Sequence, residues 1–311
     1  MEKYTPTTLS LNSGFSMPLV GFGTYNKLQV NDQVLIDAMK TAIDVGFRHL
    51  DAAWYYNNET DVGQAIKEKI EDKTVTREEL FVTSKLWSNF MAPERVEEAV
   101  RISLKDLGLT YLDLYLVHWP TPTEDCPDDR SFSSPVHDNK TDYLDTWKAM
   151  EKLVEKGLVR SIGISNFNIS QVERLLNMEG LKIKPSNHQI EIHPMFNNND
   201  LIKYSQSNGM SVTAYCPLGG MSGNSGIVNN PTLEAVGKKY GKSAAQVALR
   251  WGIQRGYAVL TKSLREERIK HNFQLWDFEL SGEDMEAVSS INSDNRLVVP
   301  NMFKGHRFCP F

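Results

Sequence analysis

Asp51, Lys85 and His118 each close a short apolar run of the sequence, and Tyr56 follows Asp51 on the next loop. A lysine ammonium next to a tyrosine favours the phenolate, and an aspartate can steady that ammonium. We therefore expect the pKa of Tyr56 to fall from about 10 toward neutrality. Such a phenol can donate a proton to a carbonyl oxygen that becomes an alkoxide, while His118 holds that oxygen in place.

This set contains an acid for a carbonyl oxygen but no nucleophile for its carbon. The carbon must then receive a hydride from a cofactor, so the set favours carbonyl reduction. Each residue alone has a more common interpretation: an aspartate caps a helix, a lysine extends to solvent, and a histidine packs in a core. The combination at the ends of successive apolar runs favours chemistry.

The elements that must position these residues alternate along the chain. Short β-rich runs alternate with segments of helical apolar periodicity, which indicates parallel strands joined by right-handed crossovers. Eight such units predict a closed (β/α)8 TIM barrel of α/β class, with polar residues at the carboxyl ends of its strands. An open dinucleotide-binding sheet is not indicated, because Gly21-Phe22-Gly23 lacks the third glycine of that motif. Predicted strands cover residues 19–23, 47–51, 80–85, 111–118, 159–165, 187–192, 211–215 and 258–261. Predicted helices cover residues 32–45, 59–70, 93–107, 143–156, 170–177, 200–207, 232–240, 243–255 and 266–273.

The whole chain, 1–311, is predicted to be a single domain. An N-terminal hairpin occupies 1–18, the barrel 19–280, and a helix with a C-terminal lid 281–311. Two long loops, 120–142 and 216–230, are of the length typical of binding loops or lids over an active site.

Composition restricts the function classes. The net charge of −5, from 34 basic and 39 acidic residues, provides no general basic field for nucleic acid. No stretch is apolar for long enough to cross a membrane, and residues 1–10 contain no secretory signal. The three cysteines form no CxxC pair, which favours a reducing compartment and a cytoplasmic location. We expect a packed, inert thiol at Cys216.

Several stretches resemble the signatures of the aldo-keto reductases, in the order found in that family. They are Asp51–Glu59, Lys85 after Phe-Val-Thr-Ser, His118 within Leu-Val-His-Trp-Pro, Ser165–Phe167, the strand with Gln189, Tyr215–Gly219, and Lys262–Ser263. The resemblance covers the chain from the hairpin to about residue 294. It implies a barrel enzyme of the aldose or aldehyde reductase kind that reduces aldehydes and ketones with NADPH.

The resemblance also implies roles for individual residues. Tyr56 would be the proton donor, Lys85 and Asp51 would tune it, and His118 would orient the carbonyl. The substrate pocket would have aromatic walls, which favour lipophilic or aromatic carbonyl compounds. Tyr25 stands where the family often has tryptophan, so the shape of the pocket stays open. Substrate-contacting residues would be Tyr25, Tyr55, Trp87, His118, Trp119, Asn295, Val298 and Pro300.

The NADPH site would draw on the ends of several strands. Asn166 and Gln189 would bind the nicotinamide amide, and Tyr215 would stack on its ring. Lys262 and Arg268 would hold the 2′-phosphate, since a dianion calls for clustered cations. Asn272 would face the adenine; because His271 replaces a frequent glutamate, selectivity for NADPH over NADH stays open. Cofactor-binding residues would be Gly23, Thr24, Tyr25, Ser165, Asn166, Gln189, Tyr215, Leu218, Lys262, Ser263, Arg268 and Asn272.

Alternative functions stay open at this point. Within the family, a ketosteroid or dehydroecdysteroid-type hormone reductase is possible, and a monomer is expected. A non-catalytic NADPH-binding or structural relative would keep the barrel without turnover. A metal-dependent hydrolase or isomerase could use Asp51, His118 and His193, but it would leave Tyr56 and Lys85 without a role. No metal site is predicted, because strand alternation places His188 opposite Glu191 and His193.

Overall fold

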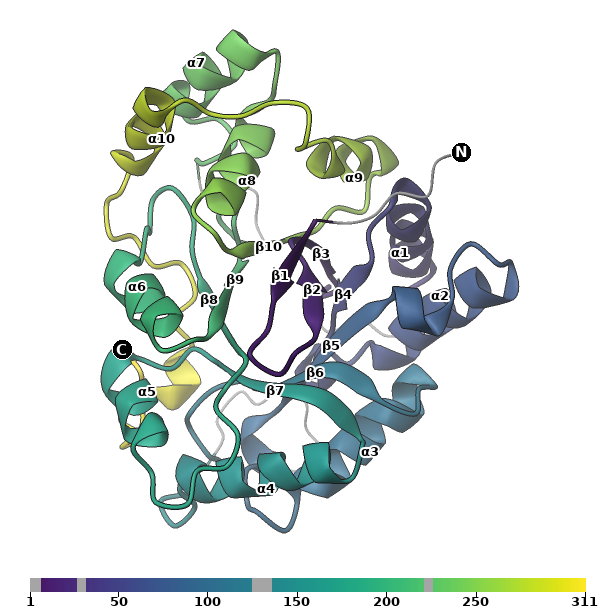
Figure 1. Ribbon diagram of the computed structural model, residues 1–311, viewed down its shortest axis with the longest axis vertical. Coiled ribbons are helices and arrows are strands. Elements are labelled where there is room, and N and C mark those ends of the chain that lie inside the picture. The colour runs from purple at the N-terminus through teal and green to yellow at the C-terminus, as the bar shows by residue number, and fades with distance from the viewer. Residues whose placement is uncertain (1–6, 27–31, 125–135, 221–225) are drawn as a thin grey trace.

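The computed structural model describes residues 7–26, 32–124, 136–220 and 226–311. Eight parallel strands close into a barrel in the order β10-β3-β4-β5-β6-β7-β8-β9, with helices around the outside (Figure 1). The predicted (β/α)8 barrel is confirmed. Its strands are β3 (Val20–Gly23), β4 (His49–Asp51), β5 (Phe81–Leu86), β6 (Leu112–Val117), β7 (Val159–Ser165), β8 (Asn187–Glu191), β9 (Ser211–Tyr215) and β10 (Ala258–Thr261).

The helices follow the predicted periodic segments closely. Helix α1 begins after Asp32, whose side chain accepts from the backbone N–H of Leu35, and ends at Gly46 with φ 124°. Val34, which we placed on the apolar face of this helix, is 57% exposed, because the buried stripe runs through its neighbours Leu35 and Ile36. The helices are α1 (Gln33–Val45), α2 (Glu59–Glu71), α3 (Val96–Leu107), α4 (Tyr143–Glu155), α5 (Ile169–Leu176), α6 (Asn199–Ser207), α7 (Pro231–Tyr240), α8 (Ala244–Gln254), α9 (Glu266–Phe273) and α10 (Gly282–Ser289).

The barrel strands are buried on both faces. Every residue of β5 and β6 is buried, because helices cover the outer face and other strands' side chains fill the interior. Close approach of backbones requires a glycine at Gly163, where a Cβ atom would lie 2.5 Å from the carbonyl oxygen of Asn187. The tight interior leaves the strand ends as the places where polar side chains can meet.

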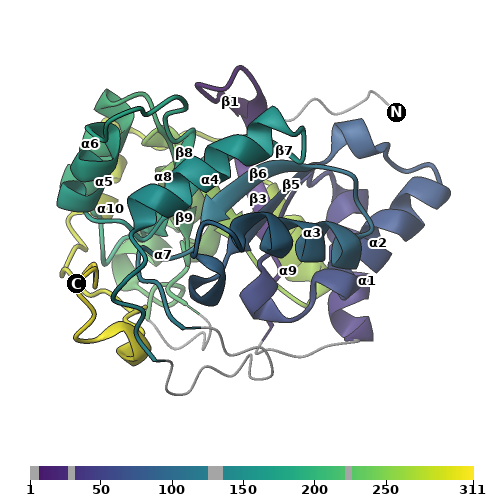
Figure 2. The same cartoon turned by 90° about the horizontal axis from the view of Figure 1, so that it is seen from below.

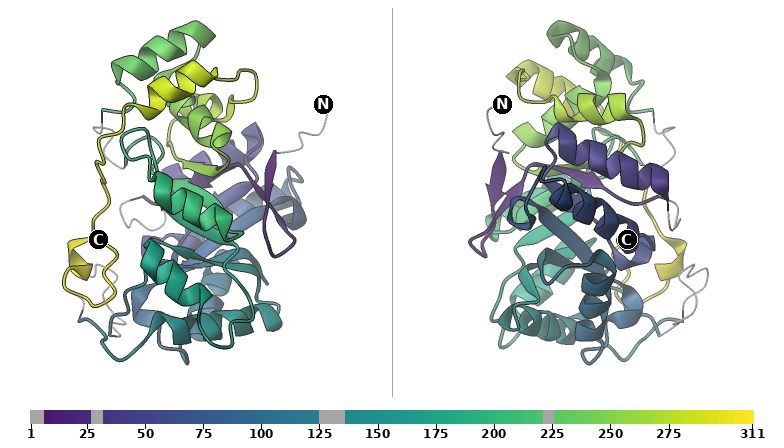
Figure 3. Two further views of the ribbon diagram at one scale, coloured as in Figure 1. Left: turned by 60° about the vertical axis from the view of Figure 1, so that its left-hand side comes forward. Right: turned by 90° about the vertical axis from the view of Figure 1, so that its right-hand side faces the viewer.

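The two ends of the barrel are closed differently. The predicted hairpin, β1 (Thr8–Ser10) and β2 (Ser16–Pro18), covers the end where the strands begin, and Gly14 supplies φ 89° in its turn. Asn12 ties this turn to the carbonyl oxygen of Pro185. Figures 2 and 3 show the C-terminal segment, in yellow, at the opposite end. The carboxyl ends of the strands are therefore the side available for a site.

Across the described ranges, none of the helices combines the length and the apolar character that a bilayer crossing requires.

Candidate active site

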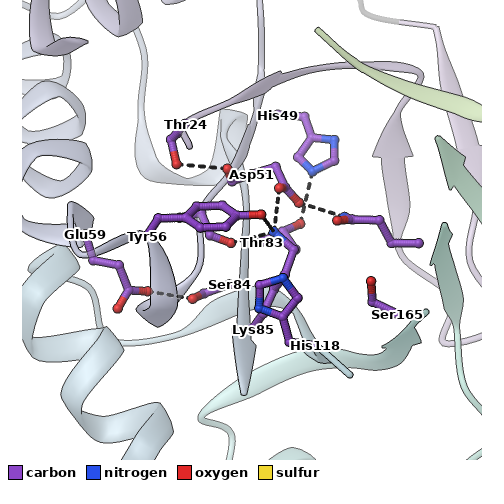
Figure 4. A network of polar contacts seen from close by, with 12 residues as sticks. Thr24, His49, Asp51, Tyr56, Glu59, Thr83, Ser84, Lys85, His118 and Ser165 are labelled. Atoms are coloured by element: carbon purple, nitrogen blue, oxygen red, sulfur yellow. Dashed lines mark hydrogen bonds and ion pairs between the residues drawn. The ribbon is translucent and has the colours of Figure 1, made fainter. Parts of the chain in front are cut away.

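The Lys85 side chain lies at the centre of the polar cluster at this end of the barrel. It is fully buried, and its Nζ donates to Asp51 Oδ1 at 2.5 Å, to the carbonyl oxygen of Ala52 at 2.8 Å and to the Tyr56 hydroxyl at 3.1 Å (Figure 4). Strands β4 and β5 are neighbours, so residues at their carboxyl ends meet. The structure thus brings Asp51, Tyr56 and Lys85 together.

Asp51 is held on both oxygens. Its Oδ2 accepts from Gln189 Nε2 at 2.8 Å, although β8 lies across the barrel from β4. The backbone N–H and hydroxyl of Thr24 both donate to the Asp51 carbonyl oxygen at 3.0 Å, next to Gly23 at the end of β3. In this arrangement the amide nitrogen of Gln189, a predicted nicotinamide contact, already serves the aspartate.

The predicted acidity of Tyr56 is wrong for the protein as described. Burial of the phenol raises its pKa well above 10, and the Asp51 carboxylate raises it further. Burial also lowers the pKa of Lys85, and Asp51 opposes this shift. Desolvation outweighs the attraction that we expected to dominate, because the ammonium is already neutralised by the aspartate. Tyr56 therefore keeps its proton.

His118 follows β6 and completes the predicted set of four. Its ring centroid lies 5.8 Å from that of Tyr56, and its buried Nδ1 has no hydrogen-bond partner among the described residues. Burial, followed by the charge of Lys85, lowers the pKa of His118 well below 6.5. The imidazole is neutral, so it can donate one hydrogen bond and accept another.

The ends of β7 and β9 meet at Asn166. This residue has a left-handed backbone, with φ 64°. Its side-chain nitrogen donates to the His118 carbonyl oxygen at 2.9 Å and to Ser165 Oγ at 3.0 Å, and its oxygen accepts from the Tyr215 hydroxyl at 2.7 Å. These predicted cofactor contacts lie together, and each described bond is internal.

The end of β10 presents cations to solvent. Lys262 and Arg268 are exposed, and Lys262 Nζ donates to Asn26 Oδ1 at 2.8 Å. Ser263 is half-buried beside them in sequence. An exposed lysine and arginine after one strand are the donor set that a phosphate group requires, so these residues fit an NADP phosphate. Asn272 is different, since it is buried and its amide nitrogen donates to Thr261 Oγ1 at 2.7 Å.

Aromatic side chains surround the catalytic cluster. Tyr55 stacks on Trp87 with ring centroids 3.8 Å apart, and Tyr25 meets Tyr56 edge-on at 5.1 Å. Trp87 lies 5.0 Å from the His118 ring. The aromatic wall predicted from the sequence exists beside the four polar residues.

Sequence reasoning missed two phenylalanines of the C-terminal tail. Phe303 is fully buried and lies 5.3 Å from the Trp119 ring, while Phe311 lies 5.7 Å from the same ring. The tail has no helical or strand periodicity that would show which residues face inward. Its aromatic content was the one available signal.

The predicted tail residues do not all face one way. Asn295 is exposed and its N–H donates to the carbonyl oxygen of Met195 at 3.1 Å. Val298 and Pro300 are partly buried, and Val298 packs against the core. Leu297 lies next to Gly220, in the loop that carries the half-buried Leu218.

Within the described ranges, no three His, Cys, Asp or Glu side chains come together to hold a metal ion. His193 donates from Nε2 to Glu191 at 2.9 Å and is fully buried. Both Asp51 oxygens are occupied by Lys85 and Gln189. Cys216 is half-buried, and burial raises its pKa to about 12, as an inert thiol requires.

A closed parallel barrel with a buried lysine, aspartate and tyrosine beside a histidine defines an oxidoreductase site that protonates a carbonyl oxygen. A sequence profile described as the Aldo/keto reductase family matches residues 19–293. The chain is 43% identical to prostaglandin F synthase 1 of Bos taurus, covering 97% of each chain. It is 42% identical to estradiol 17 beta-dehydrogenase 5 of Mus musculus, covering 98% of this chain and 97% of the relative.

The fold comparison agrees. The structure of the aldose reductase from Schistosoma japonicum superimposes with a TM-score of 0.90 at 41% identity, covering 98% of both chains. This chain belongs to the aldo-keto reductase family and is an NADP-dependent carbonyl reductase.

Proposed function

We propose that Tyr56 donates the proton in the reduction of a lipophilic or aromatic aldehyde or ketone, with Lys85, Asp51 and His118 as its partners. The observation that carries this proposal is the hydrogen bond from Lys85 Nζ to the Tyr56 hydroxyl oxygen at 3.1 Å. Because the oxygen accepts from the ammonium, the phenolic hydrogen is free to point toward a substrate oxygen.

Lys85 acts on the product of proton transfer. When the proton leaves Tyr56, the phenolate faces an ammonium 3.1 Å away. At an effective dielectric constant of about 20, that attraction is about 5 kcal/mol. The raised pKa of resting Tyr56 keeps the proton in place until a substrate oxygen develops negative charge. Asp51 keeps the ammonium in position throughout.

His118 orients the carbonyl. Its neutral imidazole lies between the Tyr56 ring and Trp87. A neutral ring can donate a hydrogen bond to the same carbonyl oxygen that Tyr56 protonates, and it carries no positive charge next to Lys85.

NADPH supplies the hydride when it is bound. Ser165, Asn166, Gln189 and Tyr215 would hold its nicotinamide, and Lys262, Ser263 and Arg268 its phosphate. Gly23, Thr24, Tyr25 and Leu218 line the path between these groups in the proposal. Asn272 would have to release its bond to Thr261 before it could reach the adenine.

The aromatic lining supports a lipophilic substrate. Tyr55, Trp87, Trp119 and Phe303 present apolar rings rather than hydrogen-bonding groups to a substrate. Two relatives are named for prostaglandin and estradiol, which are bulky lipophilic compounds. A steroid-type ketone is therefore the specific alternative within this proposal.

We also propose a cytoplasmic monomer that consists of one domain. Cys216 and Cys309 are both free thiols, which supports a reducing compartment.

A carbonyl panel tests the proposal. We expect the protein to oxidise NADPH with nitrobenzaldehyde and with a fused-ring ketone, and to do so more slowly with NADH. Loss of NADPH absorbance measures turnover, and quenching of protein fluorescence measures cofactor binding. Tight NADPH binding without turnover on any member of the panel would favour the non-catalytic alternative.

A further inference from the structure

Glu191 is a buried carboxylate that the proposed chemistry does not use. It is the last residue of β8 and is 2% exposed. Its Oε1 accepts from the backbone N–H of Leu297 at 2.7 Å, and its Oε2 accepts from the N–H of Val298 at 2.9 Å. His193 Nε2 donates to Oε1 at 2.9 Å. One side chain at the barrel rim thus holds two successive amides of the C-terminal tail.

A buried carboxylate without a basic partner is costly. No lysine or arginine of the described ranges forms an ion pair with Glu191, so hydrogen bonds alone replace its hydration. The tail amides supply two of those bonds. Loss of the tail contacts would leave the charge buried and underbonded, which gives Glu191 and the tail a mutual dependence.

The segment after β8 contributes further anchors for the same tail. The Met195 carbonyl oxygen accepts from the N–H groups of Ser293 and Asn295 at 3.2 and 3.1 Å. Asn197 Nδ2 donates to the Ser289 carbonyl oxygen at 2.7 Å. These bonds fix the tail up to residue 295, and Glu191 fixes it at 297 and 298, just before it reaches the aromatic wall.

Beyond Val298 the tail meets that wall. After Pro300, Phe303 packs on Trp119 at 5.3 Å and on Trp87 at 6.1 Å. Because Glu191 is the anchor closest in sequence to this contact, it determines how near the tail lies to the rings. A small carbonyl compound can bind beside His118 and Tyr56 alone, whereas a bulky one must also contact the tail.

We infer that Glu191 is a positioning residue that anchors the tail over the pocket and sets the binding of bulky carbonyl substrates. The inference rests on the proposed function, in which the tail contributes to the substrate pocket.

The test compares two buried glutamates. Glu191→Gln keeps the shape but turns an amide N–H toward one of the tail N–H groups, so one bond becomes a donor–donor clash. Glu151→Gln is the matched control: Glu151 is also buried, in α4, and its Oε1 accepts from the N–H groups of Lys182 and Ile183, both at 2.8 Å. Those amides lie on the far side of α4 in sequence from the tail.

In Glu191→Gln we expect KM for a fused-ring ketone to rise about tenfold, which corresponds to about 1.4 kcal/mol. We expect KM for propanal and kcat for both compounds to change less than about twofold. Hydrogen exchange at the amides of residues 297 and 298 should accelerate about tenfold. Glu151→Gln should accelerate exchange at residues 182 and 183 and leave both KM values unchanged.

Equal rises of KM for both carbonyls, or the same change in Glu151→Gln, would overturn the inference, since a general loss of structure would then explain the effect. Unchanged exchange at 297 and 298 would also overturn it. If the unmodified protein reduced neither compound, the proposed function would fail, and exchange would still decide whether Glu191 anchors the tail. Should Glu191→Gln fail to fold, exchange in the unmodified protein decides it: equal rates for Val298 and the exposed Val299 contradict anchoring.

Discussion

Each end of the barrel holds a buried aspartate, a cation and a tyrosine, but only one end is built for chemistry. At the hairpin end, Asp113 accepts from Arg77 at 2.8 Å, from Arg160 at 2.9 Å and from the N–H of Val82 at 2.9 Å. The ring of Tyr111 lies between the two guanidinium groups, 4.0 Å from each. At the other end, Asp51, Lys85 and Tyr56 form the proposed catalytic cluster.

The difference lies in where the cation meets the tyrosine. The guanidinium groups lie over the faces of Tyr111, and its buried hydroxyl has no partner among the described residues. The Lys85 ammonium donates to the oxygen of Tyr56 itself. A cation over a ring face stabilises packing, whereas a cation at the phenol oxygen stabilises the charge that appears when the proton leaves.

Removal of the two tyrosine hydroxyls should give the largest contrast. Tyr56→Phe should lower kcat about a thousandfold, because a positioned general acid contributes on that order. NADPH binding, measured by fluorescence quenching, should remain. Tyr111→Phe should leave turnover unchanged. Full activity of Tyr56→Phe would refute its assignment as the proton donor.

Neutralisation of the aspartate at the hairpin end should affect stability alone. Asp113→Asn leaves Arg77 and Arg160 without their carboxylate, so the free energy of unfolding should fall by about 3 kcal/mol. Urea unfolding measures this change, and carbonyl turnover of the folded variant should stay within about twofold. Asp277→Asn, at a side chain 66% exposed and paired with Lys242, should change stability by less than about 0.5 kcal/mol. A large loss of turnover in Asp113→Asn would show that the two ends are coupled.

Acid should destabilise the barrel interior between the two ends. Burial lowers the pKa of His49 from 6.5 to about 4 and that of His188 from 6.5 to about 3. The unfolded chain then binds more protons below pH 6.5, so stability is complete above that pH and falls as the pH decreases. Each histidine should remove about 2 kcal/mol at pH 5.

Urea unfolding at pH 7.5 and pH 5 measures this loss. His188→Asn should reduce it by about 2 kcal/mol, because asparagine can keep the bond to Ser205 without taking up a proton. His271→Asn, at an exposed position, should leave the pH dependence unchanged. Equal stability of the unmodified protein at both pH values would contradict burial of His49 and His188 as neutral rings.

The barrel and the set of four polar residues could be predicted from local patterns. The strand runs 159–165, 211–215 and 258–261 coincide with β7, β9 and β10, because buried parallel strands are apolar throughout. Helix α3 begins at Val96 rather than at Pro93, and element boundaries of this kind depend on local turns. The assembly of Asp51, Lys85 and His118 followed from their place at strand ends.

The acidity of Tyr56 and the course of the tail could not be predicted in the same way. Burial acts on Tyr56 from every element around it, so the sign of its pKa shift depends on the whole packed site. The contacts of Leu297 and Val298 join residues far apart in sequence and use backbone amides, which every residue except proline carries. No residue type marked these amides as partners of Glu191.

Local order of apolar and polar residues thus determined the closed barrel and which side chains gather at its carboxyl end, because a buried strand places its last residue at a common rim. Folding in three dimensions decided the proton of Tyr56, the cover of Phe303 over the tryptophans and the anchoring of the tail. Desolvation and long-range hydrogen bonds depend on neighbours that adjacent sequence does not specify.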